Sequence, residues 1–182
     1  MRTAPRQKRT PRPIDAARLD ELALAYVARF AASGAKLESY LKRKLRERGW
    51  EGEGEPDVAG LAARFVAAGY IDDEAYARMK AGSLRRRGYG ERRVDQTLVA
   101  AGIAQELRAE VRAGRAEQRA AALALARKRR FGPWGPQVER EVREKQLAAM
   151  LRAGHRLDIA RSVVQATDIE AAEQWAAEED DE

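Results

Sequence analysis

The chain has 182 residues, of which 35 are Lys or Arg and 29 are Asp or Glu, and its formal net charge is +6. Charged residues make up 35% and aromatic residues only 6%, which favours a solvated helical assembly over a thick globular core. The sequence has no cysteine, which excludes disulfides and thiolate metal sites. The basic balance indicates an acidic partner such as nucleic acid, although basic helices can also simply remain in solution.

The two ends of the chain carry opposite charge. Residues 1–14 contain five basic residues, three prolines and no acid, and this composition predicts a disordered basic arm. They also lack the apolar segment of a secretory signal. Residues 168–182 contain eight acids and no Lys or Arg, and we expect this acidic tail to fray. The longest apolar run, residues 120–126, is far shorter than the roughly 20 residues that span a bilayer. We therefore expect a cytoplasmic protein.

Helical periodicity begins at Asp15, and residues 15–50 are predicted to form a first repeat. A second helix places Leu37, Leu41 and Leu45 on one face and ends at Gly49. Residues 51–56, with the sequence EGEGEP, are a predicted flexible connector. The first helix carries an apolar stripe at three- and four-residue spacing. Its members are Leu19, Leu22, Ala23, Tyr26, Val27 and Phe30.

Residues 57–103 are predicted to form a second repeat, in which two short helices meet at a glycine turn. Asp72 is a good N-cap, and Ile71 and Tyr76 then occupy the two positions of a hydrophobic staple. Gly88 is placed to take the left-handed conformation that ends a helix. Gly90 can begin the next helix, which closes at residue 102. Tyr70, Tyr76 and Tyr89 are expected in staples and core rather than in base stacking.

A third repeat is predicted over residues 104–167. An alanine-leucine helix ends at the break FGPWGP, residues 131–136, and two further helices follow. Trp134 in this break is either an exposed contact or a loop anchor. The spacing Leu41, Leu45, Gly49 recurs as Val94, Leu98, Gly102, and related spacing recurs at Gly154, Ala160 and Val164. Because two or three short helices cannot bury an apolar face alone, we expect all-α tandem three-helix repeats stacked into an elongated, curved body.

Catalytic chemistry finds little support in the residues. His155 is the only histidine, and it follows a glycine that ends a helix, so we expect it to pack rather than to act as a base. Gly88-Tyr89-Gly90 lacks the third glycine and the preceding strand of a dinucleotide loop. We therefore predict that the protein is not an enzyme and uses no cofactor or metal.

Basic residues gather at comparable places in the three repeats and predict a binding surface. Arginine forks suit both phosphate and carboxylate. The run 85–87 can alternatively serve only to complement the negative end of its helix. The predicted partner- or DNA-binding residues are Arg85, Arg86, Arg87, Arg92, Arg93, Lys42, Arg43, Lys44, Arg46, Lys128, Arg129 and Arg130.

The motifs DDEAYA, RRRGYGERRV and L-x-x-x-G-I, in this order over residues 72–103, resemble the central repeat of the RecX family of bacterial recombinase regulators. The first and third repeats match less well, because Leu37 and Arg156 stand where the family pattern often has a helix-capping serine. The resemblance implies a protein without catalytic residues that binds the RecA filament on DNA, and we expect it to be a monomer. It implies inhibition of filament extension, strand exchange and coprotease activity, and so modulation of recombination, DNA repair and the SOS response.

Two other classes of function stay open. The protein could bind single- or double-stranded DNA directly, without a recombinase partner. A scaffold for an unrelated partner has little specific support. No membrane partner is expected.

Overall fold

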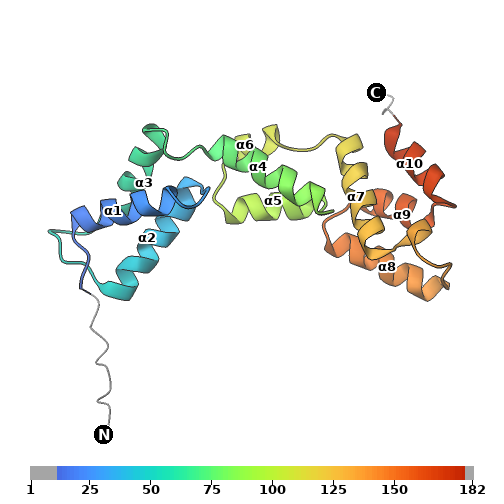
Figure 1. The fold of residues 1–182 in the computed structure, drawn as a ribbon, viewed down its shortest axis with the longest axis horizontal. Coiled ribbons are helices and arrows are strands. Elements are labelled where there is room, and N and C mark those ends of the chain that lie inside the picture. Colours follow the sequence, from blue (N-terminus) through green and yellow to red (C-terminus); the bar gives the residue numbers. More distant parts are fainter. Residues whose placement is uncertain (1–11, 179–182) are drawn as a thin grey trace, which may run out of the picture. The chain divides into compact units, whose positions relative to one another are not determined.

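The structure is a computed structural model that describes residues 12–178 (Figure 1). Within this range the chain forms ten α-helices and one short 3-10 helix and has no β-strand, which confirms the predicted all-α class. The chain divides into two compact units, an N-terminal unit of residues 1–73 and a C-terminal unit of residues 74–182. The helices are α1 (Ala16–Val27), α2 (Gly34–Arg48), α3 (Val58–Ala67), α4 (Asp73–Arg86), α5 (Glu91–Ala100), α6 (Gln105–Glu110), α7 (Arg115–Arg129), η1 (Gly132–Trp134), α8 (Arg140–Arg152), α9 (Leu157–Gln165) and α10 (Ile169–Ala177).

The N-terminal unit packs α1, α2 and α3 around one apolar core. Side-chain oxygens begin each helix: Asp15 accepts from the Arg18 amide at 2.7 Å, and Ser33 accepts from the Lys36 amide at 3.3 Å. Helix α3 has the same device in Asp57. Leucines at helical spacing then meet in the core, which includes Leu19, Leu37, Leu41 and Leu61.

The predicted boundary of the second repeat differs from the structure. The sequence predicts that the helix after residue 57 belongs to the second repeat, residues 57–103. In the structure this helix, α3, packs instead with α1 and α2: Val58, Leu61 and Ala62 lie in their core, and Ile71 lies in it as well. At the other boundary, Val111 belongs to the core of α4 and α5. A capped apolar helix carries no signal of which neighbour it packs on, because that choice depends on the path of the connecting loops.

The predicted arm is also shorter than 14 residues. Ile14 is fully buried, its amide donates to the Gly49 carbonyl at 3.0 Å, and its carbonyl accepts from the Glu51 amide at 3.0 Å. These bonds form an isolated bridge between Ile14 and Trp50. An isoleucine can leave water at no polar cost when the backbone beside it is paired. The rest of the predicted arm, residues 1–11, lies outside the described residues.

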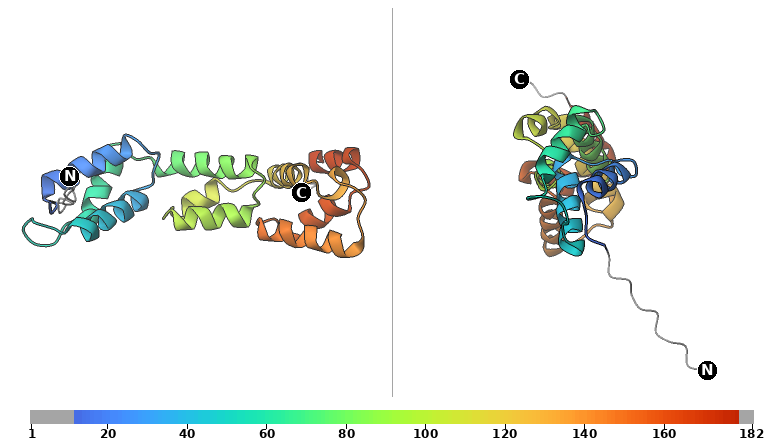
Figure 2. Two further views of the ribbon diagram at one scale, coloured as in Figure 1. Left: turned by 60° about the horizontal axis from the view of Figure 1, so that its bottom comes forward. Right: turned by 90° about the vertical axis from the view of Figure 1, so that its left-hand side faces the viewer.

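The C-terminal unit contains two cores, and Figure 2 shows the helices that surround them. Helices α4, α5 and α6 enclose the first, which buries Tyr76, Leu84, Val94 and Leu98. Helices α7 to α10 enclose the second, which includes Met150 and Val163. Tyr76 is 6% exposed, which confirms its predicted place in the core. Tyr70, at 60%, is wrongly predicted as a core residue, since it lies on the surface against Phe65.

The acidic tail does not fray over its first ten residues. Asp168 accepts from the Ala171 amide at 2.8 Å and so begins α10, which packs on α7 through the buried Ala172. Arg119 of α7, itself 8% exposed, donates to the carbonyl oxygens of Trp175 and Glu178. Charge composition hides this helix because its buried face is made of alanine and tryptophan. Residues 179–182 lie outside the described part of the chain.

Of the two predicted roles for Trp134, an exposed contact or a loop anchor, the structure supports the loop anchor. It lies half-buried against the core of α7 to α10, and the Arg127 guanidinium lies 5.8 Å from its ring centroid. Within the described residues, no helix is long and apolar enough to cross a membrane.

Candidate partner-binding surface

Five arginines flank the turn between α4 and α5, which we call the central turn. These central arginines are Arg85, Arg86, Arg87, Arg92 and Arg93. Gly88 has φ +87° and donates its amide to the Arg85 carbonyl at 2.8 Å, so the predicted left-handed helix end is confirmed. A Cβ at Gly88 would lie 2.8 Å from the backbone of Leu125. The turn is therefore pressed against α7, and glycine is required there both for its conformation and for the close approach.

The side chain of Arg85 points inward, so its predicted place on the binding surface is wrong. Its Nε donates to Glu91 at 2.6 Å, and its Nη2 donates to Glu91 at 3.0 Å and to the Val111 carbonyl at 2.6 Å. The side chains of Arg85 and Glu91 are only 14% and 15% exposed. Glu91 also accepts from the Ala113 amide, so the pair ties α4, α5 and the chain after α6 together. The Nε and Nη2 donors of Arg85 are therefore engaged inside the protein.

The other four central arginines lie on the surface. Arg86, Arg92 and Arg93 are exposed, and none has a side-chain partner among residues 12–178. The Arg87 guanidinium lies 5.3 Å from the ring centroid of Tyr89, a cation–π contact that leaves its charge available. These four cations, placed around one turn, can meet phosphate or carboxylate.

The predicted cations of α2 are more heavily paired. Lys42 lies 2.8 Å from Glu38, while Lys44 and Arg43 lie 2.7 and 3.7 Å from Glu47. The hydrogen bond from Lys44 is the main reason that the pKa of Glu47 is lowered, although slight burial opposes it. Arg46 is exposed nearby. Exposed pairs such as these are weak, and a stronger anion can displace the carboxylate.

At the end of α7, Lys128, Arg129 and Arg130 are exposed. Arg130 ends the helix with φ 56°, a left-handed conformation that is unusual for a residue other than glycine. The three predicted residues thus surround a helix end, where cations also complement the helix dipole.

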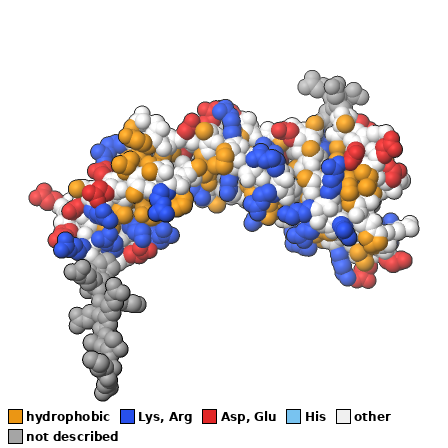
Figure 3. Space-filling view, viewed as in Figure 1, with side chains coloured by type: hydrophobic (Ala, Val, Ile, Leu, Met, Phe, Trp, Pro, Cys, Tyr) orange, Lys and Arg blue, Asp and Glu red, His pale blue; other side chains and the backbone are white. Residues whose placement is uncertain are grey.

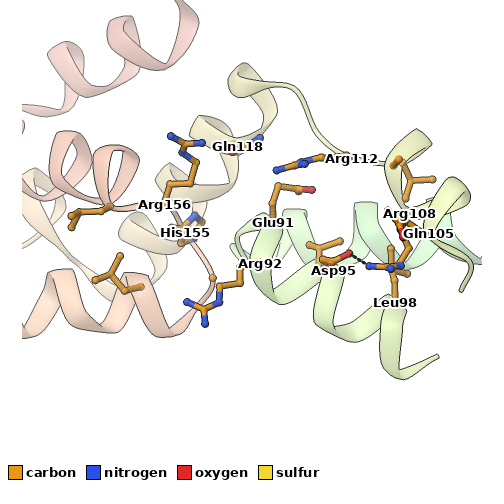
Figure 4. Close-up of a pocket in the computed structure, with 16 residues that line it drawn as sticks. Glu91, Arg92, Asp95, Leu98, Gln105, Arg108, Arg112, Gln118, His155 and Arg156 are labelled. Atoms are coloured by element: carbon orange, nitrogen blue, oxygen red, sulfur yellow. Dashed lines mark hydrogen bonds and ion pairs between the residues drawn. The ribbon is translucent and has the colours of Figure 1, made fainter. Parts of the chain in front are cut away.

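A groove of about 850 Å³ lies beside the central turn and holds arginines that the sequence did not single out (Figure 4). Side chains converge on it from α5, α6 and the turns before α7 and α9. Arg108 is paired with Asp95, and Arg156 with Asp158. Arg112 has no side-chain partner in the described residues. Both carboxylates of the lining, Glu91 and Asp95, already hold an arginine, so an entering ligand meets net positive charge.

No sequence signal marks these added cations. Arg108, Arg112 and Arg156 come from separate segments, outside the basic runs. They share one groove because the α4–α5 turn packs on the α8–α9 turn. The amide of Gly90 donates to the Ala153 carbonyl at 3.0 Å, and a Cβ at Gly90 would lie 2.4 Å from Gly154.

His155 lines the groove and is 6% exposed. Its Nε2 lies 2.9 Å from the Gly88 carbonyl oxygen, so this nitrogen carries the proton and donates. Burial lowers the pKa of His155, and the Gly88 carbonyl and Glu91 oppose that shift only in part. The neutral, hydrogen-bonded ring fills the packing role predicted for it.

Figure 3 shows basic side chains on one face of the C-terminal unit, with acids interspersed. The charge on the face in view is therefore mixed, and what distinguishes Arg86, Arg92 and Arg93 is that they have no carboxylate partner among the described residues.

Comparisons with known proteins agree with this architecture. The sequence model described as RecX, second three-helix domain, matches residues 72–111. The Regulatory protein RecX of Myxococcus xanthus (strain DK1622) is 36% identical over 169 residues, which cover 87% of this chain and 90% of that protein. The Regulatory protein RecX of Agrobacterium fabrum (strain C58 / ATCC 33970) is 33% identical over 141 residues, which cover 75% and 76%.

A solved structure shares the fold at low sequence identity. The crystal structure of RecX from Lactobacillus salivarius superposes with a TM-score of 0.63 at 18% identity and covers 82% of this chain and 94% of that chain. The agreement extends over most of both chains, so the all-α fold is common to the two.

Proposed function

Since this chain belongs to the RecX family of regulatory proteins, we propose that it binds the RecA filament on DNA and limits filament extension, strand exchange and coprotease activity. In this role it modulates recombination, DNA repair and the SOS response. It works in the cytoplasm as a monomer, by binding rather than by catalysis, and needs neither cofactor nor metal.

The observation that carries this proposal is the set of unpaired arginines around the α4–α5 turn. Arg86, Arg92 and Arg93 are exposed without a carboxylate partner among the described residues, and Arg112 adds another such cation in the adjacent groove. An arginine fork forms two parallel hydrogen bonds with a carboxylate or a phosphate. A filament offers both kinds of group at a regular spacing, and successive repeats can bridge successive subunits.

The fixed backbone of the α4–α5 turn, which carries these arginines, supports the same conclusion. The turn is fixed by the Arg85–Glu91 pair below it and by its contact with Leu125. Little conformational entropy is then lost from the backbone when the arginines are engaged. The mechanism is steric and electrostatic: the bound repeats occupy filament surface that an incoming subunit or strand requires.

The test is the double charge reversal Arg86→Glu with Arg93→Glu, assayed on naked single-stranded DNA and on RecA filaments. We expect inhibition of RecA ATP hydrolysis on single-stranded DNA to be lost. Arg140→Glu with Arg143→Glu is the matched control, since it changes the net charge equally at exposed positions of α8. It should leave inhibition intact.

Direct DNA binding without a recombinase gives a different pattern. If six to ten phosphates carry the affinity, binding to free DNA falls about 10³- to 10⁵-fold between 50 and 200 mM salt. The proposal fails if the central double reversal abolishes DNA binding while filament inhibition is unchanged.

A further inference from the structure

Three aromatic rings of the N-terminal unit, those of Tyr26, Phe30 and Tyr40, lie next to one another. The rings of Tyr26 and Tyr40 lie 4.3 Å apart between centroids with an interplanar angle of 17°. The ring of Phe30 lies 5.4 Å from that of Tyr26 and is tilted by 46°. Tyr26 lies in the last turn of α1, Phe30 follows that helix with its amide bonded to the Tyr26 carbonyl, and Tyr40 faces them from α2.

The three rings extend from the core of the unit to its solvent-exposed surface. Tyr26 and Tyr40 are half-buried and pack against the core of the unit. Phe30 is 54% exposed and is absent from that core, so its predicted inward place is wrong. Helix α1 ends at Val27, and the helical stripe that would have carried Phe30 inward ends with it. Half of a phenylalanine left in water forgoes hydrophobic stabilisation that burial would supply.

Cations lie over two of these rings, those of Phe30 and Tyr40. The Arg29 guanidinium is 5.9 Å from the Phe30 centroid, and Arg43 and Lys44 are 5.6 and 5.9 Å from the Tyr40 centroid. Arg43 and Lys44 follow Tyr40 by three and four residues, which places them on its face of α2. Arg29 has no carboxylate partner in the described part of the chain, and the other two share Glu47. We call Tyr26, Phe30, Tyr40, Arg29, Arg43 and Lys44 the aromatic–basic patch.

We propose that the aromatic–basic patch binds single-stranded DNA, with an unpaired base stacked on Phe30 and phosphates held by Arg29 and Arg43. Surfaces of this kind bind single strands because every base has a flat face and every linkage a negative charge. The pre-stacked tyrosines hold the neighbouring ring in place, and the cations polarise its face. A duplex hides its base faces and would use only the cations.

This inference adds a DNA contact to the proposed filament binding and lies in the other unit of the chain. The measurement below contains no RecA, so its failure would leave the filament proposal standing. Conversely, loss of filament inhibition in the Arg86 and Arg93 double variant says nothing about this patch.

The test compares two fluorescent strands of about 20 nucleotides, oligo(dT) and an abasic strand with the same backbone. We expect the full chain to bind oligo(dT) more tightly. Phe30→Ala should weaken oligo(dT) binding about 5- to 150-fold, which is the effect of losing one stacked base, and should leave abasic binding unchanged. Arg43→Gln should weaken the binding of both strands, because both carry phosphate.

Two variants serve as controls. Phe30→Tyr keeps a ring and should retain oligo(dT) binding. Tyr70→Ala removes an equally exposed ring elsewhere in the same unit and should have no effect. Phe30→Ala must keep the wild-type circular dichroism spectrum, as expected for an exposed side chain. The proposal is overturned if Phe30→Ala binds oligo(dT) within about twofold of wild type, or if it weakens both strands equally.

Discussion

The imidazole Nε2 of His155 donates a hydrogen bond to the carbonyl oxygen of Gly88 across 2.9 Å. The two residues lie 67 positions apart. Gly88 belongs to the α4–α5 turn and His155 to the α8–α9 turn, and these turns pack on each other. Beside this bond, the Arg92 amide donates to the Gly154 carbonyl at 3.2 Å. The arginines of the α4–α5 turn are therefore placed by a contact between two repeats, and this contact is sensitive to the charge of one ring.

The first prediction concerns pH. Burial lowers the pKa of His155 below its usual 6.5, so the unfolded chain binds a proton more readily than the folded one. Its contribution to stability is full above about pH 6.5 and is lost as pH falls through the folded-state pKa. We expect the free energy of unfolding in urea to decrease between about pH 7 and pH 5.

His155→Gln supplies the comparison, because an amide can donate to Gly88 but does not titrate. The variant should show a shallower dependence in this range. The pKa of Asp168 is also lowered, chiefly by the Ala171 amide, but from 3.8, so its contribution is lost only at more acidic pH. Equal slopes for wild type and variant would rule out His155 as the titrating group.

The second prediction separates Arg85 from its neighbour. Arg85→Ala removes the cation that pairs with the nearly buried Glu91. Because an unpaired charge is then left inside the protein, the substitution should cost about 3–5 kcal/mol of unfolding free energy. Arg86→Ala, one residue later and exposed, should change it by no more than about 0.5 kcal/mol. Urea denaturation followed by circular dichroism measures both. Similar values for the two variants would contradict the structural role of Arg85.

The third prediction concerns the close approach at the central turn. Gly88→Ala introduces a Cβ 2.8 Å from the backbone of Leu125 in addition to a left-handed conformation. Gly69 has φ +75°, and a Cβ added there would meet no neighbouring atom within 4 Å, so Gly69→Ala carries only the conformational cost of about 1–2 kcal/mol. We expect Gly88→Ala to lower the melting temperature clearly further than Gly69→Ala. Equal shifts would show that the turn relaxes away from α7.

The fourth prediction compares two tyrosines. Tyr76→Ala removes a ring that is 6% exposed and should cost about 3–5 kcal/mol of unfolding free energy. Tyr70→Ala removes a ring that is 60% exposed and should cost about 0.5 kcal/mol or less. A loss below about 0.5 kcal/mol at Tyr76 would mean that its ring contributes nothing to the core.

The amino-acid sequence by itself determined the local features of this protein. The left-handed end of α4 at Gly88, the start of α5 at Gly90 and the burial of Tyr76 were all predicted and are confirmed. Each depends on residues within one or two helical turns, where caps, φ preferences and apolar spacing act directly. The resemblance to the RecX family rests on the same stretch.

Only the tertiary structure decided which segments meet. It placed α3 with α1 and α2, turned Arg85 toward Glu91, and left Phe30 half-exposed. It also brought Arg112 to a groove with Arg156 from a distant turn. An arginine reads the same in the sequence whether its partner is a carboxylate six residues away or a ligand. What separates the two cases is the burial that a neighbouring helix imposes, because burial makes an unpaired charge costly while exposure leaves it free to bind.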